Sequence, residues 1–229
     1  MTPYLVTRHA GAPIAAHRHT FAHGSLVLEG GYEEVGPEGV WRVSAGDLLI
    51  RPPFHRHANT RFRGSARVLN VMLPHAMVRR LDLSRYRVVR PREPERFIVR
   101  ARRRPDASLG EALAHCEVRA SAHARDWLDA LADALRTDPA ARIGDLAQAF
   151  GVTPTHVARA FLARFGQTPT AFRAEQRVRR GLCALVEGRL ALAEVAVASG
   201  FADQSHLTRA IVAATGQTPA GLKRAFAPG

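Results

Sequence analysis

The second half of this chain contains the same segment twice, and this repetition constrains its fold more than any other feature. Residues 143–151 (IGDLAQAFG) correspond to residues 192–200 (LAEVAVASG), and the tetrapeptide GQTP occurs at residues 166–169 and again at residues 216–219. The two copies are 49 residues apart at the first segment and 50 residues apart at the second. A repeat of this length indicates one supersecondary unit used twice.

Each copy has the sequence features of two helices joined by a short turn. Gly151 and Gly200 lie where a helix can end in the left-handed conformation, which glycine adopts without a Cβ penalty. Thr153 with Pro154, and Asp203 in the second copy, are typical of the first residues of the next helix. The order of helix, short turn and helix predicts a helix-turn-helix, in which the second helix enters the major groove of DNA.

Helical spacing separates an apolar face from an arginine-bearing face on the second helix of each copy. The apolar residues that share a face, because they are four positions apart, are Val157 and Phe161 in the first copy and Leu207 and Ile211 in the second. Arg159 and Arg209 therefore lie on another face, where a guanidinium can donate to O6 and N7 of guanine, while Gln204 suits adenine. A solvated helix face is the alternative for any one of these residues, but the same arrangement in both copies favours DNA.

Two helix-turn-helix units in tandem, with GFADQSHLTR at residues 200–209, resemble the AraC/XylS family of transcription regulators. The resemblance covers roughly residues 124–227 and implies DNA binding through two recognition helices in successive segments of the major groove. The base-contacting positions that it implies are Thr155, Arg159, Gln204, Ser205 and Arg209. His156 and His206, near the helix starts, are expected to contact phosphate or to form a local hydrogen bond.

A helix of about Thr170–Glu187 is expected to link the two units. Its apolar residues, which helical spacing directs inward, are Phe172, Val178, Leu182 and Leu185. Its arginines, among them Arg173 and Arg177, are expected to contact phosphates, which position a protein without reading sequence; a solvated surface helix is the alternative. Where the family commonly has basic residues, this chain has LAR at residues 162–164 and VAA at residues 212–214, which predicts weaker binding by the second unit.

The first part of the chain predicts a β domain. Between residues 5 and 75, short apolar runs alternate with glycine and proline pairs, a pattern typical of a sandwich or barrel. The spacing of glycine, proline and histidine resembles the two motifs of the cupin barrel, which many AraC-type regulators carry as a sensor. His23 stands where the first motif has Glu, Phe54 replaces the Gly of the second motif, and Arg61 replaces its Asn. The expected fold class is therefore α+β, with a cupin-like β-barrel before an all-α domain.

The cupin resemblance also implies a metal site. The positions that match its ligands are His17, His19, His23 and His57. His17 and His19 point the same way if they lie on one strand, because side chains alternate along a strand. Imidazole-rich sites suit Zn, Cu, Fe or Ni. The alternative is that these histidines are inward-facing polar residues of a small-molecule pocket that holds no metal.

Net charge indicates the kind of partner, and cysteine content indicates the cellular compartment. The formal net charge of +13 favours a polyanionic partner, although residues 1–107 carry +10 of it and residues 138–229 only +5. Cys116 and Cys183 are far apart, no apolar run has membrane length, and the first residues lack a signal peptide pattern. We therefore expect reduced thiols and a cytoplasmic protein.

The expected organisation has three parts. Residues 1–107 form the sensor, residues 108–123 form a linker, and residues 124–229 form the DNA-binding domain. The linker is expected to be a helix that places Leu109, Leu113 and Cys116 on one side, a candidate dimerisation element. Residues 97–99 (FIV) are expected to form the last strand of the sensor.

These observations favour a non-enzymatic, sequence-specific transcription regulator whose barrel senses a small molecule or a metal. Its expected partners are promoter DNA, an effector, RNA polymerase and a second copy of the chain. One alternative is a cupin metalloenzyme, such as a dioxygenase or isomerase, with an accessory helical domain, but that activity needs no tandem recognition helices. Another is a non-specific nucleic-acid binder attracted by charge, whose affinity would fall steeply with salt and ignore sequence.

Overall fold

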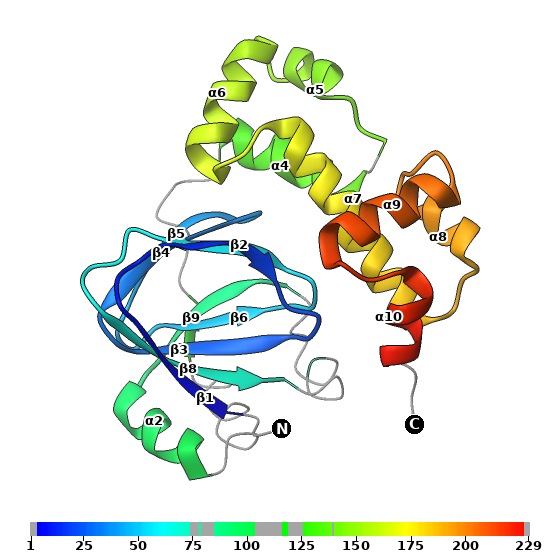
Figure 1. Ribbon diagram of the computed structural model, residues 1–229. Helices are drawn as coiled ribbons and strands as arrows, with labels where there is room; N and C mark the ends of the chain where they lie inside the picture. Colours follow the sequence, from blue (N-terminus) through cyan, green and yellow to red (C-terminus); the bar gives the residue numbers. More distant parts are fainter. Residues whose placement is uncertain are drawn as a thin grey trace. The chain divides into compact units, whose positions relative to one another are not determined.

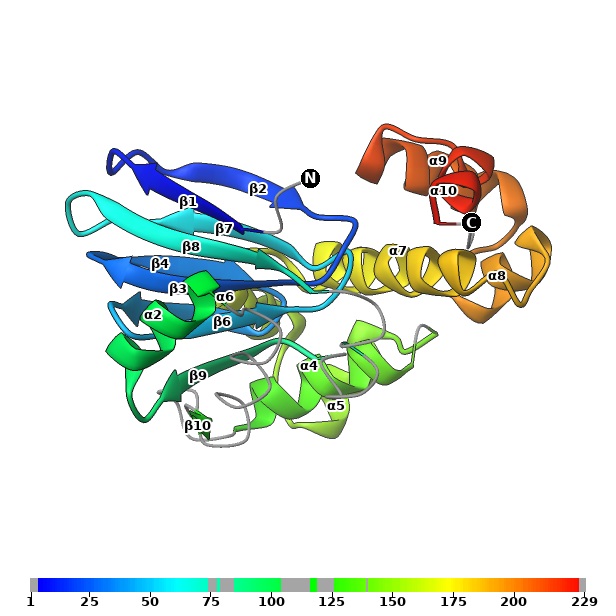
Figure 2. The ribbon, with the colours of Figure 1, turned by 90° about the horizontal axis from the view of Figure 1, so that it is seen from below.

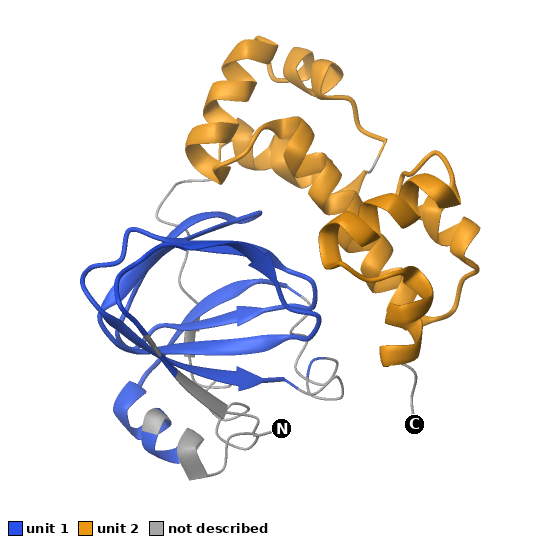
Figure 3. Cartoon of the chain, in the orientation of Figure 1, with its two compact units in different colours: residues 1–123 blue, residues 124–229 orange. Residues whose placement is uncertain are grey.

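The computed structural model describes residues 4–73, 78, 85–103, 116–118, 126–138 and 140–226. The chain divides into two compact units, Met1–His123 and Ala124–Gly229 (Figure 3). The first unit is built mainly of strands and the second of helices (Figure 1). The predicted α+β class, with a cupin-like β domain before an all-α domain, is confirmed.

The N-terminal unit consists of two antiparallel sheets. The order of the larger sheet is β1 (Tyr4–His9), β8 (Ala66–Met72), β3 (His23–Glu29), β6 (Leu48–Arg51), β9 (Arg87–Pro91) and β10 (Cys116–Val118). The order of the smaller sheet is β2 (Ile14–Arg18), β7 (Arg56–Thr60), β4 (Gly31–Gly36) and β5 (Gly39–Ser44).

The larger sheet is buried on both faces because its strands carry continuous apolar runs. Successive residues on a strand face opposite sides, so neighbours such as Leu48 and Leu49 belong to different clusters. The outer cluster includes Leu26, Leu48, Leu69, Val89 and Phe97. The inner cluster, to which the smaller sheet contributes Tyr32 and Val43, includes Val27, Leu49, Val68 and Val88. The core of this unit therefore lies on both sides of the larger sheet.

Residues 97–99 are helical, so the strand expected there is wrong. They belong to α2 (Pro94–Arg103), in which Phe97 N–H donates to the carbonyl of Glu93. Phe97 is buried against the larger sheet while Val99 is 57% exposed. Residues two apart share a face on a strand but point in different directions on a helix, and Pro94 is well suited to a helix start.

The linker prediction is wrong in part. Cys116–Val118 form β10, which pairs with β9 of the larger sheet, so no helix passes through these residues. Leu109 and Leu113 lie outside the described residues. A dimerisation element in the linker stays a prediction.

The C-terminal unit contains two helix-turn-helix pairs. Its helices are α4 (Trp127–Thr137), α5 (Ile143–Ala149), α6 (Pro154–Phe165), α7 (Pro169–Glu187), α8 (Leu192–Ala198), α9 (Gln204–Thr215) and α10 (Pro219–Phe226). The pairs α5–α6 and α8–α9 are the two copies of the repeat. The expected linking helix is confirmed as α7, which runs between α4 on one side and α9 and α10 on the other (Figure 2).

Local sequence determines where the helices begin and end. Gly151 and Gly200 have φ of 65° and 81°, so the predicted left-handed helix ends are confirmed. The Thr153 hydroxyl accepts from His156 N–H at the start of α6, and the Asp203 carboxylate accepts from His206 N–H at the start of α9. Both recognition helices therefore begin on equivalent caps.

Each helix-turn-helix has its own apolar core on α7. The first half of α7 supplies Phe172, which contacts the rings of Phe161 and Phe165. The second half supplies Val178, Leu182 and Leu185, so all four residues expected to point inward are buried. Gly181 permits close packing of α7 on α9, since a Cβ there would lie 2.8 Å from Cδ1 of Leu207. Cys183, which also lies on α7, is a free cysteine.

Two turn residues of the N-terminal unit adopt the left-handed region without being glycine. Phe54 has φ of 58° and Arg61 has φ of 45°. These are the positions at which the cupin motif has Gly and Asn, residues that tolerate positive φ. Phe54 is fully buried, which offsets its backbone strain, whereas Arg61 is exposed and has only a 3.5 Å ion pair with Glu33.

Replacing Arg61 with Asn should therefore stabilise the N-terminal unit. Relief of the left-handed strain is expected to raise the free energy of unfolding by about 0.5–1 kcal/mol, because the lost surface ion pair contributes little. Urea unfolding of the full chain measures this. Arg63→Asn is the matched control: Arg63 is exposed and does not have positive φ. Equal or lower stability of Arg61→Asn relative to Arg63→Asn would contradict the prediction.

Candidate functional site

The N-terminal unit encloses a cavity of about 370 Å³ between its two sheets. Part of its wall is apolar, with Ile14, Phe21 and Val68. The rest is polar: it includes the four predicted metal-ligand histidines and also Ser25, Tyr32, Arg51, Asn59 and Asn70. A volume of this size accommodates a small organic molecule.

Three of the four predicted metal ligands form a group in this cavity. His17 on β2 is paired directly with His57 on β7, and His19 follows β2 immediately. One candidate ligand atom from each of these histidines lies within 4.8 Å of the other two. The ring centroids of His17 and His57 are 4.4 Å apart, and those of His17 and His19 are 5.1 Å apart.

A hydrogen bond of His17 and the protonation states of His19 and His57 suit metal coordination. His17 donates from Nδ1 to the carbonyl of Ala15 at 2.9 Å, which leaves Nε2 as the ring nitrogen available to a metal. Burial lowers the pKa of His19 to about 4, with smaller effects from His17 and Arg51. Burial, and then the charge of Arg51, lower the pKa of His57. His19 and His57 are therefore neutral at pH 7, and a metal ion would displace no proton from either ring.

His23 is placed differently from the other three. It lies outside the group, and its Nε2 is 3.3 Å from Nη1 of Arg51, which donates to it. Burial, and then Arg51, lower the pKa of His23. An imidazole whose lone pair already accepts a hydrogen bond from a guanidinium is a poor additional ligand. The grouping therefore favours a three-histidine site over the four-histidine site expected from the cupin resemblance.

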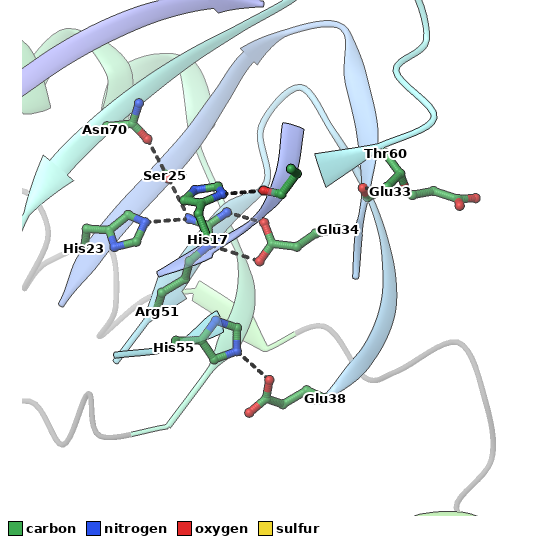
Figure 4. Close-up of polar contacts among 11 residues, drawn as sticks. His17, His23, Ser25, Glu33, Glu34, Glu38, Arg51, His55, Thr60 and Asn70 are labelled. Atoms are coloured by element: carbon green, nitrogen blue, oxygen red, sulfur yellow. Dashed lines mark hydrogen bonds and ion pairs between the residues drawn. The ribbon is translucent and has the colours of Figure 1, made fainter. Parts of the chain in front are cut away.

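A buried polar network, not anticipated from the sequence, surrounds Arg51 (Figure 4). Glu34 accepts from Nε of Arg51 at 3.0 Å and also from Nη2. Nη1 of Arg51 donates to Ser25 Oγ at 2.6 Å, Ser25 donates to Asn70 Oδ1 at 2.7 Å, and Asn70 donates to Thr7 Oγ1 at 3.2 Å. This chain of bonds connects β4 of the smaller sheet to β6, β3, β8 and β1 of the larger one.

The sequence gives a weak indication that Arg51 is buried. Arg51 directly follows the apolar run at residues 48–50 and precedes Pro52, so it extends a buried strand. Its side chain is 2% exposed and that of Glu34 is 1% exposed. A charge that continues a buried strand requires a buried partner, although the sequence does not identify which acidic residue that is.

Some buried polar atoms of the cavity lining have no hydrogen-bond partner among the described residues. Two of them belong to β7: Nδ1 of His57 and Oδ1 of Asn59. Buried polar atoms are normally paired. Both atoms are thus suited to contact a molecule bound in the cavity.

The second candidate site is the outer face of the two recognition helices. Residues that are fully buried occupy one side of each helix: Val157 and Phe161 on α6, and Leu207 and Ile211 on α9. All the base-contacting candidates are exposed: Thr155 and Arg159 on α6, and Gln204, Ser205 and Arg209 on α9. Neither helix has its arginine-bearing face packed against the rest of the unit. Contact of these residues with bases stays a prediction.

His156 and His206 are exposed but are held by local contacts. The ring of His156 lies 5.4 Å from that of Trp127, and the ring of His206 lies 5.2 Å from that of Phe201. The backbone N–H of each histidine is bound by the cap of its helix. A local hydrogen bond or a phosphate contact by either ring stays a prediction.

Several arginines of the helical unit make contacts within the protein. Arg173 donates to the carbonyl of Ala141 at 2.9 Å. Burial, and then the charge of Arg173, lower the pKa of Arg177. Arg164, the basic residue of the segment at 162–164, pairs with the carboxylates of Asp126 at 2.7 Å and Asp129 at 3.2 Å. Phosphate contacts of Arg173 and Arg177 stay predictions, and the contacts of Arg164 give it a structural role.

Comparison with known proteins agrees with this architecture. A family model described as a helix-turn-helix domain matches residues 146–225 and so spans both copies of the repeat. No curated protein gives a significant match. Among the described residues, no helix is both long and apolar enough to cross a bilayer.

Several solved structures are similar to the chain. ToxT from Vibrio cholerae has 10% sequence identity over 97% of both chains, with a TM-score of 0.45. An AraC-type DNA-binding domain-containing transcriptional regulator from Chromobacterium violaceum has 21% identity over 45% of this chain and 95% of its own, with a TM-score of 0.42. A probable AraC family transcriptional regulator from Rhodopseudomonas palustris CGA009 has 18% identity over 45% of this chain and 100% of its own, with a TM-score of 0.41.

Neutralising Glu34 should destabilise the N-terminal unit strongly. In Glu34→Gln the charge of Arg51 stays buried without its carboxylate, and we expect a loss of about 3–5 kcal/mol in the free energy of unfolding. Glu29→Gln is the matched control, because Glu29 is 57% exposed and its ion pair with Arg67 lies at the surface; it should lose less than about 1 kcal/mol. Urea unfolding measures both, and similar losses in the two variants would contradict the prediction.

Proposed function

We propose that the chain is an AraC-type helix-turn-helix transcription regulator whose barrel is a sensor that controls how the helical domain binds a promoter. The role that we propose is not enzymatic. A promoter duplex, a small effector, RNA polymerase and a second copy of the chain are the partners that we propose, and the cytoplasm is the compartment. We propose residues 1–107 as the sensor and residues 124–229 as the DNA-binding domain; residues 108–123 connect them and add β10 to the larger sheet of the sensor.

One observation supports base reading above all others. The exposed residues of α6 and α9 occupy equivalent positions in the two copies, with Arg159 and Arg209 at the centre of each exposed face. Arginine suits the O6 and N7 edge of guanine, and Gln204 suits adenine. We propose that α6 and α9 enter successive segments of the major groove and that these residues read bases.

For the barrel we propose a transition-metal site made by His17, His19 and His57. Neutral imidazoles suit Zn, Cu, Fe or Ni. One candidate ligand atom from each of the three histidines lies within 4.8 Å of the other two, so these residues would hold the ion together. A bound metal would supply an open coordination position for an electron-donating group of an effector.

The effector would complete the site. Asn59 Oδ1 is suited to accept a hydrogen bond from it, and the apolar wall at Ile14, Phe21 and Val68 is suited to its hydrocarbon part. An effector changes DNA binding only if it contacts the barrel differently in two states of the protein. His17 and His57 are paired residues of the adjacent strands β2 and β7. We expect the two states to differ in the arrangement of these two residues.

Removing Arg209 tests base reading. Arg209→Ala should lose discrimination at one base position, at a cost of about 1–3 kcal/mol on the preferred sequence and little on others. Binding-site selection followed by titration of single-base variants measures this. Arg224→Ala is the control, because Arg224 is an exposed arginine on α10, outside both recognition helices. Uniform weakening of all sequences by Arg209→Ala would assign Arg209 to a phosphate.

Removing two histidines tests the metal site. His17→Ala combined with His19→Ala should abolish metal retention and the response to effector, and DNA binding by the helical domain should persist. Elemental analysis of protein purified without an affinity-tag metal column measures the first effect. His9→Ala is the control, since His9 lines the cavity but lies outside the histidine group. If the unmodified protein retains no metal and binds none on titration, the metal proposal fails and a metal-free pocket remains.

A further inference from the structure

Each recognition helix carries an exposed apolar side chain at the same position of the repeat. Leu162 on α6 is 57% exposed and Val212 on α9 is 39% exposed. They are 50 residues apart, the same offset that relates Arg159 to Arg209. Single exposed apolar residues are common on proteins. Two at equivalent positions of a repeated DNA-binding unit indicate a shared role.

Helical geometry places both side chains on the proposed base-reading face. At 100° per residue, Leu162 is about 20° around the helix from Thr155 and about 60° from Arg159. Val212 has the same relation to Ser205 and Arg209. The opposite sides of α6 and α9 are filled by the buried residues of the two cores. Leu162 and Val212 therefore face whatever Arg159 and Arg209 face.

The residues that follow Leu162 and Val212 provide no charged side chain that is available to contact DNA. Leu162 is followed by Ala163, which is exposed, and by Arg164, which pairs with Asp126 and Asp129 on the α4 side. Val212 is followed by Ala213 and Ala214. An aliphatic side chain cannot donate a hydrogen bond to a phosphate, so these positions are suited to an apolar partner.

We infer that Leu162 and Val212 each contact the 5-methyl group of a thymine. This methyl is the apolar group that the major groove presents, and aliphatic side chains read it by contact. The inference rests on the proposed function, because it takes the arginine-bearing faces to enter the groove. Leu162 and Val212 lie about one helical turn beyond Arg159 and Arg209, so each thymine is expected within about two base pairs of a guanine that the arginine reads.

Replacement of thymine by uracil tests this contact directly, because it removes the methyl and keeps the base pair. The full-length protein is first used to select a preferred duplex, and each thymine of that duplex is then replaced in turn by uracil. Loss of one buried methyl should weaken binding about three- to fivefold. We expect this at one thymine contacted by Leu162 and at another contacted by Val212.

Variants assign each thymine to its side chain. Leu162→Ala should weaken binding to the thymine duplex and show no further loss on the uracil duplex at its own position, while it remains sensitive at the other position. Val212→Ala should show the reverse. Val197→Ala is the control: Val197 is 72% exposed on α8, outside the recognition helices, and its removal should leave both uracil effects unchanged.

Three outcomes would overturn the inference. The first is a wild-type protein that is indifferent to uracil at every position of a selected site. The second is a Leu162→Ala variant that keeps the full uracil effect at the same position. The third is a Leu162→Lys variant that binds more tightly and steepens the salt dependence by about one phosphate contact, because the position would then face the backbone. Failure to select any sequence would instead overturn the proposed function itself.

Discussion

Burial of one apolar face on α6 and on α9 is the constraint that determines which side chains these two helices expose. Val157 and Phe161 on α6 are fully buried, as are Leu207 and Ile211 on α9. Each residue of a helix has a fixed direction around the helix axis, so burial of one face determines which residues are exposed. The exposed arginines are therefore a consequence of core packing, and their equivalence in the two copies follows from the equivalence of the cores. Residues at the exposed positions can therefore change without loss of the fold.

The barrel interior is organised by a different constraint, the need to pair a buried charge. Glu34 neutralises the buried charge of Arg51, and this pair joins the smaller sheet to the larger one. The remaining donors of Arg51 hold Ser25 and His23. The same charge also lowers the pKa of His19, His23 and His57, in addition to burial, because a nearby cation disfavours a second positive charge. Structural stability and the chemistry of the site therefore depend on one ion pair.

Local sequence predicted the features that depend on neighbouring residues. The helix ends at Gly151 and Gly200, the linking helix α7 and the two-sheet architecture are confirmed because each follows from spacing or composition. The pairing of Glu34 with Arg51 was not predictable, because it depends on how strands of two different sheets face each other. Residues 97–99 were assigned wrongly because a short apolar run fits either a strand or a helix, and only packing on the sheet distinguishes them.

Charge distribution bears on how this chain can bind DNA. The excess of positive charge lies mainly in residues 1–107, where arginines such as Arg42 and Arg67 are paired with Glu33 and Glu29. In the helical unit, Arg164 is bound to carboxylates and Arg173 to a carbonyl. Side chains held in this way contribute less to phosphate neutralisation, the term that dominates non-specific affinity. If the chain reads bases as proposed, base edges supply a larger share of the binding energy, and apolar contacts there add discrimination without adding charge.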